Sequence, residues 1–153
     1  MRESKGLLLV EDNPNDAELI VKVLVKHNRT EDIVVVRDGV EALEYLCRQG
    51  RYSDRPSENP AVILMDIKMP KVDGLNVLRQ IKTDPELRLI PVVMLTSSRQ
   101  ENDLANAYKL GANAYVVKPV DFQTFQNTIN SLSLFWGEIN EAPPSYVRRN
   151  PGA

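Results

Sequence analysis

Short runs of aliphatic and β-branched residues recur along the chain and alternate with longer stretches in which apolar residues have helical spacing. Five runs are strand candidates: Leu7 to Val10, Ile33 to Val36, Val62 to Met65, Val92 to Leu95 and Ala114 to Val117. These runs are continuously apolar rather than alternating, which is typical of a sheet buried on both faces. Their alternation with helices predicts a three-layer α/β fold, a (βα)5 doubly wound parallel sheet with right-handed crossovers.

The stretches after the five runs predict helices, each with an apolar stripe. The stripes consist of Ala17, Ile20, Val21 and Leu24; Val40, Leu43, Leu46 and Cys47; Val77, Leu78 and Ile81; Leu104 and Tyr108; and Phe125, Ile129, Leu132 and Trp136. Helix N-terminal caps are expected at Asn13, which precedes Pro14, and at Asp38, Asp73 and Asp121. We therefore expect five helices that pack their stripes against the sheet.

Two segments depart from this pattern. Residues 49–61 are polar with two prolines and predict a loop that is long for a compact domain. The residues after Trp136 carry little that could pack. Each segment is interpreted either as solvated surface or as a place where a partner binds. The expected organisation is an N-terminal extension (1–6), one domain (7–136) and a C-terminal tail (137–153) without an output domain.

The composition is typical of a single globular domain, with 153 residues, 42% of them apolar and 26% charged. A net charge of −2 disfavours a nucleic-acid-binding protein, which usually has a basic face. The apolar runs are too short for a membrane helix or a signal peptide. The single cysteine, Cys47, cannot form an internal disulfide and is expected to be a small buried residue. We therefore expect a cytoplasmic protein that binds neither nucleic acid nor membrane.

Polar side chains directly follow four of the predicted strands: Glu11 and Asp12, then Asp66, Thr96 and Lys118. The carboxyl ends of parallel strands lie at one edge of a sheet, so these groups should converge there. Three converging carboxylates repel one another unless a cation offsets their charge, and oxygen ligands suit Mg²⁺ or Mn²⁺. Each residue alone is an ordinary cap, surface hydroxyl or solvated lysine. Their joint occurrence predicts a site that receives one phosphoryl group.

Four segments carry a resemblance to a known family: LLLVEDNPND, ILMDIKMPKVDG, VVMLTSS and GANAYVVKP. They resemble the receiver domain of two-component response regulators, and the resemblance covers roughly Leu7 to Trp136. It implies a flavodoxin-like (CheY-like) sheet with strand order 2-1-3-4-5. It also implies a single-domain response regulator that takes part in phosphorelay signal transduction.

By this resemblance, Asp66 is the phosphoacceptor and receives its phosphoryl group from a phosphohistidine of a sensor histidine kinase. Asp12 would bind Mg²⁺ (or Mn²⁺) directly and Glu11 through water. The backbone carbonyl of Lys68 would be a further ligand. Apart from Mg²⁺-dependent self-phosphorylation and dephosphorylation, no enzymatic turnover is expected.

The resemblance also implies how the phosphoryl group is sensed. Lys118 would pair with the phosphoryl oxygens, and Thr96 would move inward to hydrogen-bond them. Tyr115 would act as an aromatic switch that turns inward with Thr96, although an ordinary partly buried strand tyrosine is the plain alternative. The bond between Lys118 and Pro119 would be cis.

A narrower resemblance concerns partners. The DNPND stretch, the Thr96-Ser97-Ser98 triplet and the long loop before the third strand are similar to the small regulators of cyanobacterial and bacterial phytochromes. The kinase implied is therefore a phytochrome. Leu134 and Phe135 lie off the stripe of the last helix, and exposed apolar residues there favour a contact face. We expect a homodimer through helix 4, strand 5 and helix 5.

The sequence disfavours three alternative functions. A phosphatase of the haloacid dehalogenase type needs a second acid two residues after the nucleophile, where this chain has Lys68. A nucleotide- or flavin-binding protein needs a glycine-rich loop after the first strand, and residues 11–15 contain no glycine. A receiver that is never phosphorylated is disfavoured because no member of the acidic, hydroxyl or lysine set is missing.

Overall fold

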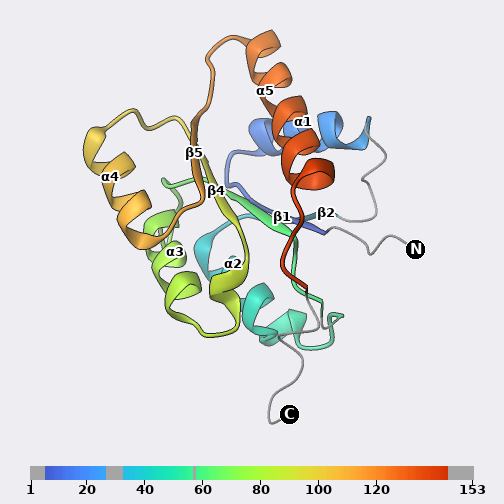
Figure 1. Ribbon diagram of the computed structural model, residues 1–153, viewed down its shortest axis with the longest axis vertical. Coiled ribbons are helices and arrows are strands. Elements are labelled where there is room, and N and C mark those ends of the chain that lie inside the picture. The colour runs from blue at the N-terminus through green and yellow to red at the C-terminus, as the bar shows by residue number, and fades with distance from the viewer. Residues whose placement is uncertain (1–5, 27–32, 57, 145–153) are drawn as a thin grey trace.

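The computed structural model describes residues 6–26, 33–56 and 58–144. These residues form one parallel sheet with strand order β2-β1-β3-β4-β5 (Figure 1). The strands are β1 (Leu7–Val10), β2 (Ile33–Val36), β3 (Val62–Met65), β4 (Val92–Thr96) and β5 (Ala114–Val117). The predicted fold and strand order are confirmed, and β4 extends one residue further than predicted, to Thr96.

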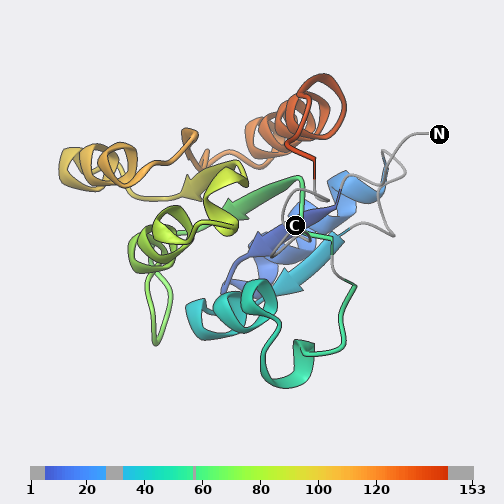
Figure 2. The same cartoon turned by 60° about the horizontal axis from the view of Figure 1, so that its bottom comes forward.

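Helices cover both faces of the sheet (Figure 2). The α-helices are α1 (Pro14–Val25), α2 (Gly39–Cys47), α3 (Gly74–Thr83), α4 (Glu101–Leu110) and α5 (Phe122–Leu134). Shorter helical segments are η2 (Gly50–Tyr52), η3 (Leu87–Leu89) and the π-helical η4 (Phe135–Ile139), which continues α5. One core lies between the sheet and α1 with α5, and the other lies between the sheet and α2, α3 and α4. None of the described helices is long and apolar enough to cross a membrane.

All four predicted caps are present. The side chain of Asn13 accepts hydrogen bonds from two backbone N–H groups in the first turn of α1, and Pro14 is the first residue of that helix. Asp38, Asp73 and Asp121 each accept one from the backbone N–H three residues later, at 2.8, 2.9 and 2.8 Å. These caps satisfy N–H groups that would otherwise have no partner in the helix. The start of each of these helices is therefore set locally, by a side chain within its own first turn.

Strand register brings the ends of β1 and β3 together. Val10 pairs with Met65, and the backbone N–H of Asp66 donates to the carbonyl of Val10 at 3.1 Å. On the other side of β1, the N–H of Glu11 donates to the carbonyl of Val36 at 3.0 Å. The residues that follow β1 and β3 are therefore held side by side by the sheet itself.

Some of the predicted core positions are wrong. Cys47 is exposed, because α2 buries Gly39, Ala42 and Leu46, and Cys47 is the next residue around the helix from that stripe. Leu104 and Tyr108 of α4 are 40% and 52% exposed. α4 instead packs through a small residue, Ala107, and through Asp103. The apolar stripe of α4 therefore faces solvent, since the sheet contact needs only a narrow, small-residue face.

Arg55 organises the segment 49–61, which was predicted as a long loop. Its guanidinium donates to the carbonyls of Tyr45 and Leu46 at the end of α2, and to the carbonyl of Glu58 further along the loop. The guanidinium carbon also lies 4.3 Å from the centre of the Tyr45 ring. The described part of the segment is therefore tied to α2 by side-chain contacts. Residues 145–153 of the predicted tail (137–153) and residues 1–5 of the predicted extension (1–6) lie outside the described residues.

Candidate functional site

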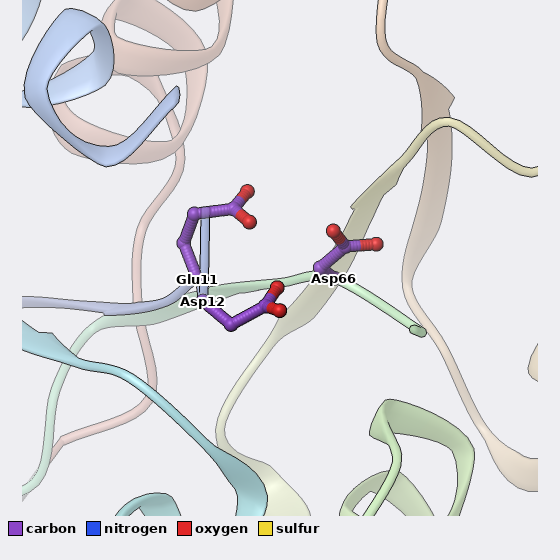
Figure 3. A group of neighbouring side chains, drawn as sticks. All are labelled: Glu11, Asp12 and Asp66. Atoms are coloured by element: carbon purple, nitrogen blue, oxygen red, sulfur yellow. The ribbon is translucent and has the colours of Figure 1, made fainter. Parts of the chain in front are cut away.

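Three carboxylates meet where β1 and β3 end. Oxygen atoms of Glu11, Asp12 and Asp66 all lie within 4.8 Å of one another (Figure 3). Glu11 and Asp66 are buried, whereas Asp12 is more exposed. A cluster made only of carboxylate oxygens, with one member open to water, fits a hard divalent cation that keeps part of its hydration shell. The sequence-predicted ligands Glu11, Asp12 and Asp66 are therefore brought together by the fold.

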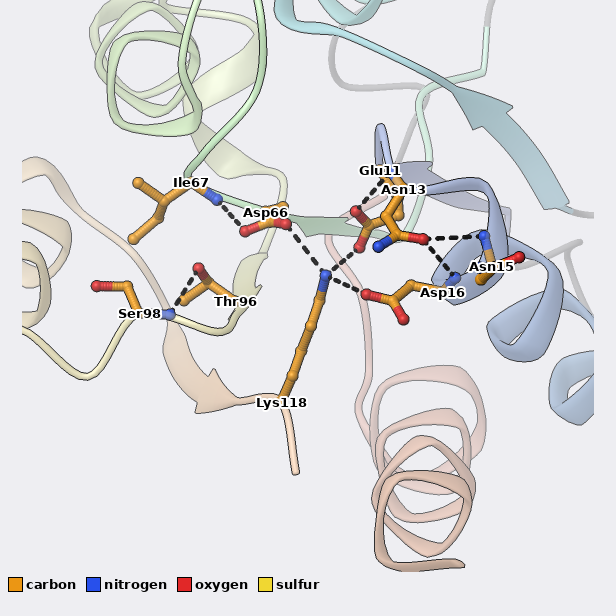
Figure 4. Close-up of polar contacts among 9 residues, drawn as sticks. All are labelled: Glu11, Asn13, Asn15, Asp16, Asp66, Ile67, Thr96, Ser98 and Lys118. Carbon is orange, nitrogen blue, oxygen red and sulfur yellow. Dashed lines mark hydrogen bonds and ion pairs between the residues drawn. The ribbon is translucent and has the colours of Figure 1, made fainter. Parts of the chain in front are cut away.

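Lys118 reaches into this cluster from the end of β5. Its Nζ atom lies 2.6 Å from Oε1 of Glu11, 3.1 Å from Oδ2 of Asp66 and 2.9 Å from Oδ2 of Asp16 (Figure 4). The lysine side chain is only 5% exposed. One ammonium group therefore faces several carboxylates in a nearly dry space, and the negative charge is not fully offset by it.

Burial and charge shift the pKa values of this pair. Burial raises the pKa of Glu11 to about 7, even though the hydrogen bond and the positive charge of Lys118 act in the opposite direction. Burial alone would lower the pKa of Lys118. The hydrogen bonds from Glu11 and Asp16 and the charges of Glu11 and Asp66 outweigh burial and raise it above its ordinary value. Lys118 therefore remains a cation, and burial favours the protonated form of Glu11.

Thr96 lies at the end of β4, next to the strand that carries Asp66, and its side chain is fully buried. Its Oγ1 atom accepts a hydrogen bond from the backbone N–H of Ser98 at 3.2 Å (Figure 4). The hydroxyl of Tyr115 donates to the carbonyl of the same Ser98 at 3.1 Å. Thr96 and Tyr115 are therefore linked through one residue, although the movement predicted for them stays a prediction.

Lys68 does not place its side chain in the carboxylate cluster. The Lys68 side chain is 68% exposed, and its Nζ atom lies 3.8 Å from Oδ2 of Asp103 on α4. Asp103 also accepts a hydrogen bond from the hydroxyl of Ser98 at 2.5 Å. The predicted role of the Lys68 carbonyl as a metal ligand stays a prediction.

The implied cis bond is not observed. No described peptide bond is cis, so Lys118 and Pro119 are joined in the trans form. For a bond that precedes proline, trans is favoured by about 0.5–1 kcal/mol.

Asp16 contacts Lys118 in the site, and Asp103 borders the site through Ser98 and Lys68; the sequence analysis predicted neither role. Asp16 contacts Lys118, which is 102 residues away in the chain. Asp103 lies on the buried face of α4, whereas the apolar spacing predicted that Leu104 and Tyr108 would form that face. The one signal for Asp16 was its place in the first turn of the helix after β1, which starts at the edge of the sheet where ligands bind.

A cavity of about 390 Å³ lies beside Lys118. It is lined by Asn15, Asp16, Leu19, Ser97, Arg99, Lys118, Pro119, Val120, Phe122 and Phe125. These residues come from the start of α1, the segment after β4 and the connection from β5 into α5. The buried lysine thus borders an opening large enough for part of another molecule.

Comparison with known proteins places these features in a family. The response regulator receiver domain matches residues 7–130. The response regulator Rcp1 of Synechocystis sp. is 37% identical over 139 residues, which are 91% of this chain and 93% of Rcp1. The crystal structure of Rcp1 in its Mn²⁺-bound form has a TM-score of 0.84, with 36% identity and coverage of 92% and 99% of the two chains.

Two further solved structures are similar. The phosphorylated cyanobacterial phytochrome response regulator RcpA has a TM-score of 0.88 and 37% identity, over 93% of this chain and all (100%) of RcpA. The bacteriophytochrome response regulator AtBRR has 54% identity and a TM-score of 0.71, over 92% of this chain and all (100%) of AtBRR. The sheet order, the acidic cluster and these matches agree, and the chain belongs to the family of response regulator receiver domains.

Proposed function

We propose that Asp66 accepts a phosphoryl group from a phosphohistidine of a sensor histidine kinase. An oxygen of the Asp66 carboxylate would form a bond to phosphorus as the bond from phosphorus to the histidine nitrogen breaks. The observation that carries this proposal is the 3.1 Å distance between Oδ2 of Asp66 and Nζ of Lys118, beside the other two carboxylates. Phosphoryl transfer needs mainly positioning and charge neutralisation, and this site offers both.

A divalent cation, Mg²⁺ or Mn²⁺, is part of the proposal. Asp12, Asp66 and the carbonyl of Lys68 would hold it directly and Glu11 through water, and the bound ion would neutralise charge on the phosphoryl oxygens. Support comes from the close carboxylate oxygens and from Rcp1, which has been solved with Mn²⁺. The same cation would support self-phosphorylation from small donors and self-dephosphorylation.

Lys118 and Thr96 would recognise the phosphoryl group. Lys118 would pair with its oxygens, and Thr96 would give up its bond to the N–H of Ser98 and donate to an oxygen. Tyr115 would follow, because its hydroxyl is bonded to the carbonyl of the same Ser98. A charge-assisted hydrogen bond contributes about 1.5–3 kcal/mol, enough to change a two-state loop equilibrium at least tenfold.

The kinase proposed is a phytochrome. RcpA is a cyanobacterial phytochrome response regulator and AtBRR a bacteriophytochrome response regulator, and both align over most of this chain. A cytoplasmic location belongs to the same proposal. The free, exposed thiol of Cys47 is compatible with a reducing compartment.

The proposal includes a homodimer through α4, β5 and α5. Leu104 and Tyr108 on α4 and Leu134 on α5 are 40%, 52% and 52% exposed, so this face has apolar side chains to bury. Sedimentation over a concentration series, with and without phosphorylation, should show a dimer. A strict monomer under both conditions would reject it.

Incubation with acetyl phosphate and Mg²⁺, followed by intact-mass measurement, tests the acceptor. We expect the gain of one phosphoryl group, which hydroxylamine removes because it is an acyl phosphate. Asp66→Asn should take up none, whereas Asp54→Asn, the same change at an exposed loop position, should behave as the unmodified protein. Acid-labile phosphate on the Asp66→Asn protein would reject the assignment.

A further inference from the structure

Three carboxylates from three elements hold Nζ of Lys118, and they differ in what else they can bind. Glu11 and Asp66 belong to the acidic cluster that fits a cation. Asp16, from the first turn of α1, is not a member of that cluster. The 2.9 Å contact between Asp16 and Lys118 is therefore independent of the cluster.

The start of α1 holds Asp16 in place. Asn13 caps the helix and accepts the N–H of Asp16 at 3.2 Å, and Pro14 restricts the same turn. A carboxylate in the first turn is also favoured by the helix dipole. The side chain of Asp16 is 26% exposed and contacts Lys118 rather than extending into water. The geometry is that of an anchor for the lysine.

The need for an anchor follows from charge. A divalent ion bound to the cluster would draw on the carboxylates of Glu11 and Asp66, which Lys118 now contacts, and it would repel the ammonium group. Lys118 would then keep one carboxylate that the ion does not use, that of Asp16. Without it, the lysine would either compete with the ion for Glu11 and Asp66 or turn into the adjoining cavity, which Arg99 also lines.

We infer that Asp16 is a positioning residue that retains Lys118 at the edge of the site while a divalent cation occupies the cluster. The ammonium group then stays within reach of a phosphoryl group on Asp66. This inference rests on the proposed role of Asp66. It assigns to Asp16 a function in phosphoryl uptake that acts through Lys118 alone.

The test compares two neutralising changes on one helix. Asp16→Asn removes the anchor, and Glu18→Gln removes a carboxylate whose only described ion pair is with the exposed Lys22, at 3.0 Å. Two quantities are measured: the dissociation constant for Mn²⁺ alone by calorimetry, and the rate of phosphorylation by acetyl phosphate. Asp16→Asn should slow phosphorylation about tenfold and weaken Mn²⁺ binding several-fold, as expected for the loss of one charge-assisted contact. Glu18→Gln should leave both unchanged, and Asp16→Glu should restore most of the loss.

A double-mutant cycle separates positioning from a simple charge effect. In a Lys118→Met background, Asp16→Asn should change either quantity less than twofold, because the residue it positions is absent. Equal losses in both backgrounds would overturn the inference, and so would an Asp16→Asn protein that matches Glu18→Gln. In either case the function of Asp66 would stand. Failure of the unmodified protein to take up phosphate would reject the proposed function instead, and the Mn²⁺ cycle would still decide the role of Asp16.

Discussion

Gly74 lies directly against the backbone of Asp66: a Cβ atom at position 74 would lie 2.0 Å from the carbonyl oxygen of Asp66. The N–H of Gly74 also donates to the carbonyl of Ile67 at 2.8 Å. The first turn of α3 is therefore packed onto the strand end that carries the proposed acceptor. Only a residue without a side chain leaves room for this approach.

Gly74→Ala should destabilise the protein by about 1–3 kcal/mol, because backbone atoms rather than a flexible side chain must move. The same shift should displace Asp66 and slow its phosphorylation by acetyl phosphate. Urea unfolding measures the first effect and intact mass the second. Gln80→Ala, at an exposed position of the same helix, is the control and should change neither. A Gly74→Ala protein with unchanged stability would contradict the close approach.

Glu11 should make stability depend on pH in cation-free buffer. Its pKa is about 7 in the folded protein against an ordinary value of 4.5, so the folded state binds more protons between these values. The contribution of Glu11 to the free energy of unfolding is therefore fully present below pH 4.5 and is lost as the pH rises through 7. The loss amounts to at most about 3 kcal/mol. Urea unfolding of the unmodified protein and of Glu11→Gln, with a chelator present, should give curves that diverge over this range. Parallel curves would show that burial of Glu11 does not raise its pKa.

Tyr115→Phe should lower the free energy of unfolding by about 1 kcal/mol, the usual net contribution of one hydrogen bond. The reason is that the carbonyl of Ser98 loses the hydroxyl that donates to it. Tyr108→Phe removes the same atom from a tyrosine that is 52% exposed and should cost almost nothing. Denaturant unfolding of the pair gives the difference. If both variants are equally stable, the hydrogen bond from Tyr115 to Ser98 does not contribute to the free energy of unfolding.

Arg55→Ala should loosen residues 49–61. Its guanidinium donates to carbonyls at the end of α2 and on the loop. Without it these carbonyls can bond only to water, and the free energy of unfolding should fall by about 1–3 kcal/mol. Hydrogen exchange should rise in residues 49–61 and at the end of α2. Arg51→Ala is the control, since Arg51 is 68% exposed and its ion pair with Glu41 is long, at 3.7 Å. Unchanged exchange after loss of Arg55 would show that the loop is held by other contacts.

Local patterns in the sequence determined most of the fold and the chemical groups of the site. Continuous apolar runs predicted all five strands, because strands buried on both faces need no alternation. Caps such as Asn13 and Asp38 predicted where helices begin, because a cap bonds within its own turn. The groups after the strands, Asp66 and Lys118 among them, converge because the carboxyl ends of parallel strands share an edge.

Only the tertiary structure decided which helix faces are covered and which distant groups meet. Leu104 and Tyr108 have the spacing of a buried stripe, yet the way α4 lies on the sheet turns them to solvent. In the sequence Asp16 is an ordinary acidic residue in the first turn of a helix. Only the packing of α1 places its carboxylate 2.9 Å from Nζ of Lys118. The physical reason is the same in both cases: periodicity and capping are properties of a few neighbouring residues. Contacts between elements depend on how whole helices are placed against the sheet.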